Sequence, residues 1–103
     1  MSPERYLFAD VDRLVHEPSR AIILSILVTV ESADFVYLQR ETQLTRGNLS
    51  VHLSKLEAAG YVHIEKTYRG RVPLTLCRIT TAGREAFDAY RQQLRDFVEN
   101  TKE

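Results

Sequence analysis

The chain lacks the features of a secreted or membrane-spanning protein. Its single cysteine, Cys77, cannot form a disulfide within the chain, and a short chain without a disulfide framework suits a reducing compartment. No apolar run approaches the roughly 18 to 20 residues needed to cross a bilayer. The first residues carry Glu4, Asp10 and Asp12 in place of the basic start of a signal peptide. We therefore expect a soluble, cytoplasmic protein.

The sequence also lacks a net charge, because 14 Lys and Arg residues balance 14 Asp and Glu residues. Composition alone therefore does not indicate a nucleic-acid partner, and the distribution of charge has to be considered instead. Residues 1–39 carry six acidic and three basic side chains, whereas residues 40–72 carry six basic and three acidic ones. The middle third is the part that can attract an anionic partner.

Neither repeats, low-complexity tracts nor flexible linkers divide the chain. With 103 residues, of which 44% are hydrophobic, it can bury one modest core and has no room for a second domain. We expect a single domain spanning residues 1–103.

Apolar spacing predicts two helices before the basic middle of the chain. Isoleucine, leucine and valine recur at helical intervals over Ser19–Val30, with Pro18 supplying part of the start signal. Asp34 is a good N-cap for a short second helix that ends near Gln39 or Glu41.

A third helix is expected to begin after Thr45, its N-cap, and to end before Gly60, which suits a left-handed residue. The face of this helix that we expect to be exposed carries short polar and basic side chains and one apolar residue, Val51. A merely solvated face would usually carry more Glu and Lys. The inward face is marked by Leu49, Leu53 and Leu56 at i, i+4 and i+7.

The rest of the chain predicts a hairpin and a long final helix. Apolar and polar side chains alternate over Tyr61–Tyr68, as they do in a strand, and Arg69–Pro73 forms a basic turn with proline as a breaker. Leu74–Ile79 then forms the returning strand. Thr80 or Thr81 caps the final helix. The fold class is therefore mainly α with a small β-hairpin, in the order of a winged helix-turn-helix.

In that layout the third helix would enter the major groove of duplex DNA, and short side chains would let its backbone approach the bases. Arg46 suits guanine, Asn48 suits adenine and Val51 suits a thymine methyl group. Ser50, Ser54 and Lys55 suit phosphates, and Thr45 can both cap the helix and face a phosphate. The candidate DNA-binding residues of this helix are Thr45, Arg46, Gly47, Asn48, Ser50, Val51, Ser54 and Lys55.

The turn of the hairpin is the second candidate contact. Arg69 and Arg71 flank Gly70, so two guanidinium groups can project past a thin backbone into a minor groove or along its phosphates. Tyr68 is placed to touch DNA at the base of this turn. The alternative is a pair of solvated arginines, which is the commoner fate of arginines in a turn that lacks such a neighbouring helix.

Three segments together resemble the small bacterial and archaeal winged-helix regulators of the MarR/ArsR type. They are residues 44–62, the run Tyr68-Arg69-Gly70-Arg71 and the run Ile79-Thr80-Thr81-Ala82-Gly83-Arg84. The most specific part is the leucine-spaced helix that ends in Glu57-Ala58-Ala59-Gly60-Tyr61-Val62, and the resemblance covers roughly residues 10–90.

The resemblance implies a dimeric transcription factor, commonly a repressor, that binds a pseudo-palindromic operator. It divides the chain into an N-terminal helical segment (1–17), a helix-turn-helix with its wing (18–80) and a C-terminal dimerisation helix (81–103). Terminal helices would form the dimer interface, although both could instead pack onto the chain's own core. The candidate dimer residues are Tyr6, Leu7, Val11, Phe87, Tyr90, Leu94, Phe97 and Val98.

Other chemistry finds little support in the sequence. Cys77 stands alone, the final helix from Ala82 onward has no histidine, and neither His16 with Glu17 nor His52 with His63 completes a metal site. No catalytic motif is present, so we expect neither an enzyme nor a cofactor. A small-molecule effector between the terminal helices stays open. The alternative function is a winged-helix module that binds another protein, which the neutral overall charge would suit.

Overall fold

The computed structural model describes residues 11–101 as four helices and a three-stranded antiparallel sheet, which confirms the predicted fold class. The sheet has the strand order β1-β3-β2. The elements are α2 (Pro18–Leu27), β1 (Ala33–Asp34), α3 (Phe35–Thr42), α4 (Arg46–Ala58), β2 (Val62–Arg69), β3 (Val72–Ile79) and α5 (Thr81–Asn100).

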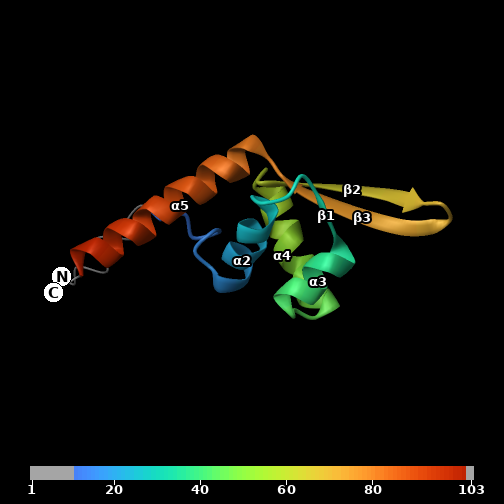
Figure 1. The fold of residues 1–103 in the computed structure, drawn as a ribbon, viewed down its shortest axis with the longest axis horizontal. Coiled ribbons are helices and arrows are strands. Elements are labelled where there is room, and N and C mark those ends of the chain that lie inside the picture. The colour runs from blue at the N-terminus through green and yellow to red at the C-terminus, as the bar shows by residue number, and fades with distance from the viewer. Residues whose placement is uncertain (1–10, 102–103) are drawn as a thin grey trace.

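Two elements project from a central cluster of helices. Figure 1 shows α2, α3 and α4 gathered in the middle, with the β2–β3 hairpin reaching out on one side and α5 on the other. The molecule is accordingly elongated, with extents of 56 × 26 × 21 Å. The tip of the hairpin and the C-terminal end of α5 lie at opposite ends.

The core forms where α4 lays its leucine face on the other helices. Leu49, Leu53 and Leu56 are at most 2% exposed, as predicted. Burying such a side chain stabilises the fold by about 1.5–3 kcal/mol. The fully buried partners from the other helices are Ile23, Leu24 and Leu27 of α2 and Leu38 of α3.

The predicted helix starts are confirmed by side-chain caps. The carboxylate of Asp34 accepts the N–H of Tyr37 at 2.7 Å, and the hydroxyl of Thr45 accepts the N–H of Asn48 at 3.1 Å. Thr80, rather than Thr81, is the N-cap of α5. Each cap contributes about 1 kcal/mol by pairing a backbone donor that the helix leaves free.

Some predicted boundaries are wrong. Helix α2 ends at Leu27 rather than Val30, because the backbone N–H and the hydroxyl of Thr29 both donate to the carbonyl of Ile26 and turn the chain toward β1. The two-residue strand β1, which pairs with β3 through Ala33 and Cys77, was not predicted. So short a strand carries no period that a sequence can reveal.

The hairpin turn is shorter than predicted. Arg69 pairs with Val72, so that only Gly70 and Arg71 form the turn, and Gly70 has a φ of 63°. A positive φ at the first position is what a type II′ turn requires. Pro73 lies inside β3 instead of ending it, since β1 pairs only farther along and leaves that edge of β3 free, where proline is tolerated.

The described part of the predicted N-terminal helical segment is not helical. Residues 11–17 form turns, while residues 1–10 lie outside the described range. The carboxylate of Asp12 accepts the N–H groups of Leu14 and Val15, at 2.9 and 3.4 Å, and its carbonyl accepts the N–H of His16 at 2.8 Å, so that a single turn forms but does not continue as a helix. Val15 follows this turn into the core and is fully buried.

We expect Gly83→Ala to destabilise the protein by about 2–4 kcal/mol, because the first turn of α5 packs tightly on Tyr61, which follows α4, and on Ile79 at the end of β3. An added Cβ would clash with the carbonyl oxygen of Tyr61 and lie 2.8 Å from Cγ1 of Ile79. Urea unfolding measures the change. The matched control is Gly47→Ala, whose Cβ meets nothing, and equal stability of the two variants would contradict the expectation.

Candidate nucleic-acid interface

The face of α4 opposite its buried leucines is open to solvent. All twelve residues predicted as contacts, eight at α4 and four at the hairpin turn, are exposed. At 100° per residue, the ridge directly opposite the core carries Gly47, Val51, Ser54 and Ala58. Because these side chains are short, a partner can approach the helix backbone closely along the ridge.

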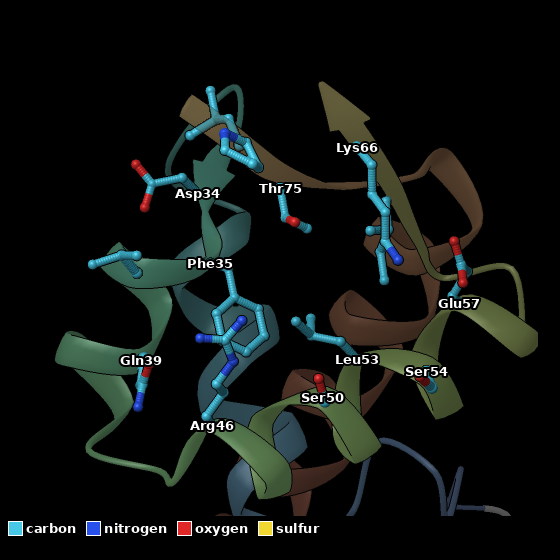
Figure 2. Close-up of a pocket in the computed structure, with 14 residues that line it drawn as sticks. Asp34, Phe35, Gln39, Arg46, Ser50, Leu53, Ser54, Glu57, Lys66 and Thr75 are labelled. Carbon is cyan, nitrogen blue, oxygen red and sulfur yellow. The ribbon is translucent and has the colours of Figure 1, made fainter. Parts of the chain in front are cut away.

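A groove runs along one flank of this ridge, between α4, α3 and one face of the hairpin. Its volume is about 590 Å³ (Figure 2). From α4 it receives Arg46, Ser50, Ser54 and Glu57, which follow one another at intervals of three and four. The opposite wall is formed by the two long strands.

Arg46 occupies this groove rather than the ridge. Its guanidinium carbon lies 6.0 Å from the centre of the Phe35 ring, and Figure 2 shows the two side chains facing each other. A cation over an aromatic face gains about 0.5–1 kcal/mol at an exposed site. Phe35 packs on the core and also presents its ring to Arg46.

Two further groove residues were not predicted. Lys66 of β2 and Thr75 of β3 face each other across the hairpin and both line the groove. In Figure 2 the Lys66 side chain points down toward Leu53 and α4. Strand alternation placed Lys66 only on one face of the sheet, and nothing in the sequence says that this face meets α4.

Side chains of both charge signs line the groove. Arg46 and Lys66 bring positive charge to opposite walls, while Asp34 and Glu57 also line the groove. The hydroxyl groups of Ser50, Ser54 and Thr75 provide neutral hydrogen-bonding groups between them. This combination of cations and hydroxyls is suited to phosphate oxygens, and the carboxylates restrict where a phosphate can lie.

The hairpin turn carries its cations away from the rest of the protein. Arg69, Gly70 and Arg71 are exposed at the tip, and Tyr68 is 69% exposed beside them. Figure 1 shows that none of the other labelled helices and strands lies near this tip. The two guanidinium groups are therefore accessible to a partner that also contacts α4.

Behind α4, a polar cluster joins the helix to residues 11–20. Arg20 contacts Nδ1 of His52 at 3.2 Å and donates to the carbonyl of Leu14 at 2.6 Å. The Glu17 carboxylate accepts the N–H of Arg20 at 2.8 Å as the N-cap of α2 and lies 3.7 Å from His52. His52, partly buried in this cluster, helps to position α4 from its inner side.

Hydrogen bonds to the same N-terminal turn tie down two tyrosines. The hydroxyl of Tyr61 donates to the carboxylate of Asp12, and this bond, with burial and the negative charge of Asp12, raises the pKa of Tyr61. Burial also raises the pKa of Tyr90, whose hydroxyl lies 3.0 Å from Nδ1 of His16. Both phenols therefore stay protonated at neutral pH.

The predicted dimer residues that the structure describes differ in how deeply they are buried. Phe87 and Tyr90 are 7% and 8% exposed and belong to the chain's own core, so they do not offer a dimer surface. Val11 and Leu94 pack partly against the same core. Val98 is 62% exposed and Phe97 is half-buried, on the part of α5 that extends beyond the core. Tyr6 and Leu7 lie outside the described residues.

Cys77 is a structural residue in the middle of the sheet. It is fully buried, and burial, together with the carboxylates of Glu57 and Asp34, raises the pKa of its thiol to about 11. Among residues 11–101, no three His, Cys, Asp or Glu side chains gather as a metal site would need. In the same range, no helix combines the length and hydrophobicity of a membrane span.

Comparison with known proteins places this arrangement in a family. The family model of the winged helix DNA-binding domain matches residues 20–98. An uncharacterized protein of Methanocaldococcus jannaschii is 40% identical over 82 residues, which span 79% of this chain and 88% of that protein.

Solved structures agree with this match. A transcriptional regulator homologue of Pyrococcus horikoshii superposes with a TM-score of 0.86 at 26% identity, covering 100% of both chains. A MarR-family transcriptional regulator of Silicibacter pomeroyi gives a TM-score of 0.69 at 22% identity, covering 92% of this chain and 63% of that one. The fold that the resemblance to winged-helix regulators of the MarR/ArsR type predicted is thereby confirmed.

We expect Glu17→Gln to destabilise the protein by about 0.5 kcal/mol at pH 7, a small value because the carboxylate is partly solvated. Burial alone would raise the pKa of Glu17, but the N–H groups of Arg20 and Ser19 and the charges of His52 and Arg20 lower it below its usual 4.5. A lowered pKa stabilises the fold above the unfolded value, and the stabilisation is lost as the pH falls through the folded value.

Chemical unfolding of both proteins at pH 7 and pH 3 measures this difference. It should shrink toward zero at pH 3, where protonated glutamate resembles glutamine. A difference that stays constant with pH would show that charge at Glu17 has no part in the stability.

Proposed function

Because the chain belongs to the winged helix DNA-binding domain family, we propose that it binds a specific double-stranded DNA site as a homodimer and represses transcription there. The observation that carries the proposal is the exposed face of α4, a ridge of short side chains beside a groove with basic and hydroxyl groups. An α-helix of this kind fits the major groove of B-DNA. Repression needs only that the bound protein occupies the operator.

Base reading is assigned to α4. Val51, on the ridge, would pack against a thymine methyl group, and Asn48 would pair with adenine from one flank. Arg46 stays in the groove over Phe35 and would bind a phosphate, together with Ser50 and Ser54. This revises our expectation that Arg46 reads guanine.

The hairpin supplies the second part of the interface. Lys66, in the middle of β2, would neutralise the DNA strand that passes between α4 and the hairpin. Arg69 and Arg71, at its tip, would enter the next minor groove or follow its phosphates. Tyr68, exposed beside them, would pack on the sugar–phosphate chain. Cations spaced along the hairpin thus follow one continuous DNA surface.

A second copy of the chain is proposed to dimerise through the distal part of α5. The helix is 20 residues long, so it spans about 30 Å, and its buried residues, Gly83, Phe87 and Tyr90, all lie in its first half. Leu94, Phe97 and Val98 continue the apolar stripe where α5 leaves the body. Pairing of these stripes would set the two α4 helices about one turn of DNA, ~34 Å, apart.

We expect Arg46→Ala and Arg69→Ala each to weaken DNA binding about tenfold, because each removes a guanidinium from the proposed surface. Each change should also reduce the dependence of log K on log salt by about one phosphate contact. Fluorescence anisotropy on a duplex selected from random DNA, with an unselected duplex for comparison, provides the measurement.

The matched control is Arg91→Ala, which removes the same charge from the exposed part of α5. It should leave DNA affinity nearly unchanged. If the wild-type protein binds selected and unselected duplexes equally, specific regulation is contradicted. If the wild-type protein binds no duplex, and both arginine variants bind a protein partner as well as the wild type does, the chain functions as a protein-interaction module instead.

We expect Val98→Asp to shift the protein toward the monomer, because it places a charge in the apolar stripe of α5. Sedimentation equilibrium should show a dissociation constant raised at least about tenfold, and operator affinity should fall with it. Asn100→Asp is the control, since it adds the same charge nearby but off the stripe. A wild-type protein that is monomeric on its operator would contradict the dimer.

A further inference from the structure

The turn that leads into α4 contains a residue in an unfavourable conformation. Gln43, the C-cap of α3, has φ 62° and ψ 17°, which is the left-handed region. Side chains other than glycine and asparagine are disfavoured there. Among residues 11–101 the other two positions with positive φ, 60 and 70, are both glycine.

Among residues 11–101, no contact explains why glutamine stands at this position. Its side chain is exposed, and no hydrogen bond joins its amide to another residue of the described range. Only its backbone N–H is used, in a 2.9 Å bond to the carbonyl of Gln39, which glycine would make equally well. The fold would therefore be more stable with glycine at this position.

The opposite mismatch occurs four residues later. Gly47 lies in the first turn of α4, where its φ is not positive and an added Cβ would meet no atom within 4 Å. A helix favours alanine over glycine, because glycine loses more backbone freedom. Alanine would therefore stabilise the fold here without any clash.

Position 43 therefore lacks glycine although its backbone conformation favours glycine. Position 47 has glycine although its helical backbone favours alanine. Local deviations from the most stable choice are expected at surfaces that serve a function. Gly47 lies on the ridge of α4, and Gln43 lies in the turn that leads into that helix. A single surface that requires a side chain at 43 and none at 47 accounts for both.

We propose that Gln43 is a DNA-positioning residue, whose amide hydrogen-bonds a backbone phosphate while Gly47 lets the duplex lie against the bare start of α4. The inference rests on the proposed function. Gln43 precedes the helix and lies at the edge of the surface, which suits the sugar–phosphate chain rather than the floor of the major groove. A neutral amide fixes position there without adding to the salt dependence.

The test compares Gln43→Gly and Gly47→Ala with the wild-type protein at one protein concentration. Both variants should raise Tm, by about 1–6 °C. Both should weaken duplex binding about fivefold or more, on selected and unselected DNA alike for Gln43→Gly, and with an unchanged salt slope. Ser25→Ala, a neutral change at an exposed position of α2, should alter neither affinity nor salt slope.

Each other result has a defined meaning. If Gln43→Gly and Gly47→Ala bind DNA within twofold of wild type while Arg69→Ala is impaired, the inference is wrong and the proposed function stands. If Gln43→Gly lowers Tm, the glutamine supports the fold, and the inference is again wrong. If the wild-type protein binds no duplex at all, the proposed function fails, and this inference fails with it.

Discussion

The leucine face of α4 is the constraint on which the rest of the structure depends. Leu49, Leu53 and Leu56 are buried against α2 and α3, which fixes both the position and the rotation of the helix. Once that face is turned inward, helical geometry leaves Gly47, Val51 and Ser54 outward. The chain therefore specifies an exposed surface by specifying what it buries.

Interactions within a few residues along the chain were predictable. Asp34, Thr45 and Thr80 begin helices because a short polar side chain pairs with a free N–H three residues ahead, and this relation is visible in the sequence. The period of the leucines likewise predicted which face of α4 is buried. Where an end depended on a local bond that has no regular pattern, as at Thr29 in α2, the boundary was wrong.

Features that depend on packing between distant segments were not predictable. Phe35 and Arg46 meet only because α3 and α4 cross there, and Lys66 enters the groove only because the hairpin folds back over α4. Phe87, Tyr90 and Val98 lie on the same apolar stripe of α5, yet Phe87 and Tyr90 are buried in the core and Val98 is exposed beyond it. Periodicity shows the face of a helix but not how far along the helix its partner extends.

The relation between α4 and α5 follows from the short segment that joins them to the hairpin. Tyr61, just after α4, accepts the N–H of Thr80 at 3.0 Å, and the hydroxyl of Thr80 donates to the carbonyl of Gly60 at 2.6 Å. Gly83 permits the first turn of α5 to lie directly on this junction. The distal stripe of α5 is therefore held at a fixed angle to the exposed ridge of α4. In a dimer formed through that stripe, this junction would set the distance between the two ridges, and with it the spacing of the DNA half-sites. The half-site spacing would therefore depend on residues that lie outside the ridge itself, namely Gly60, Tyr61, Thr80 and Gly83.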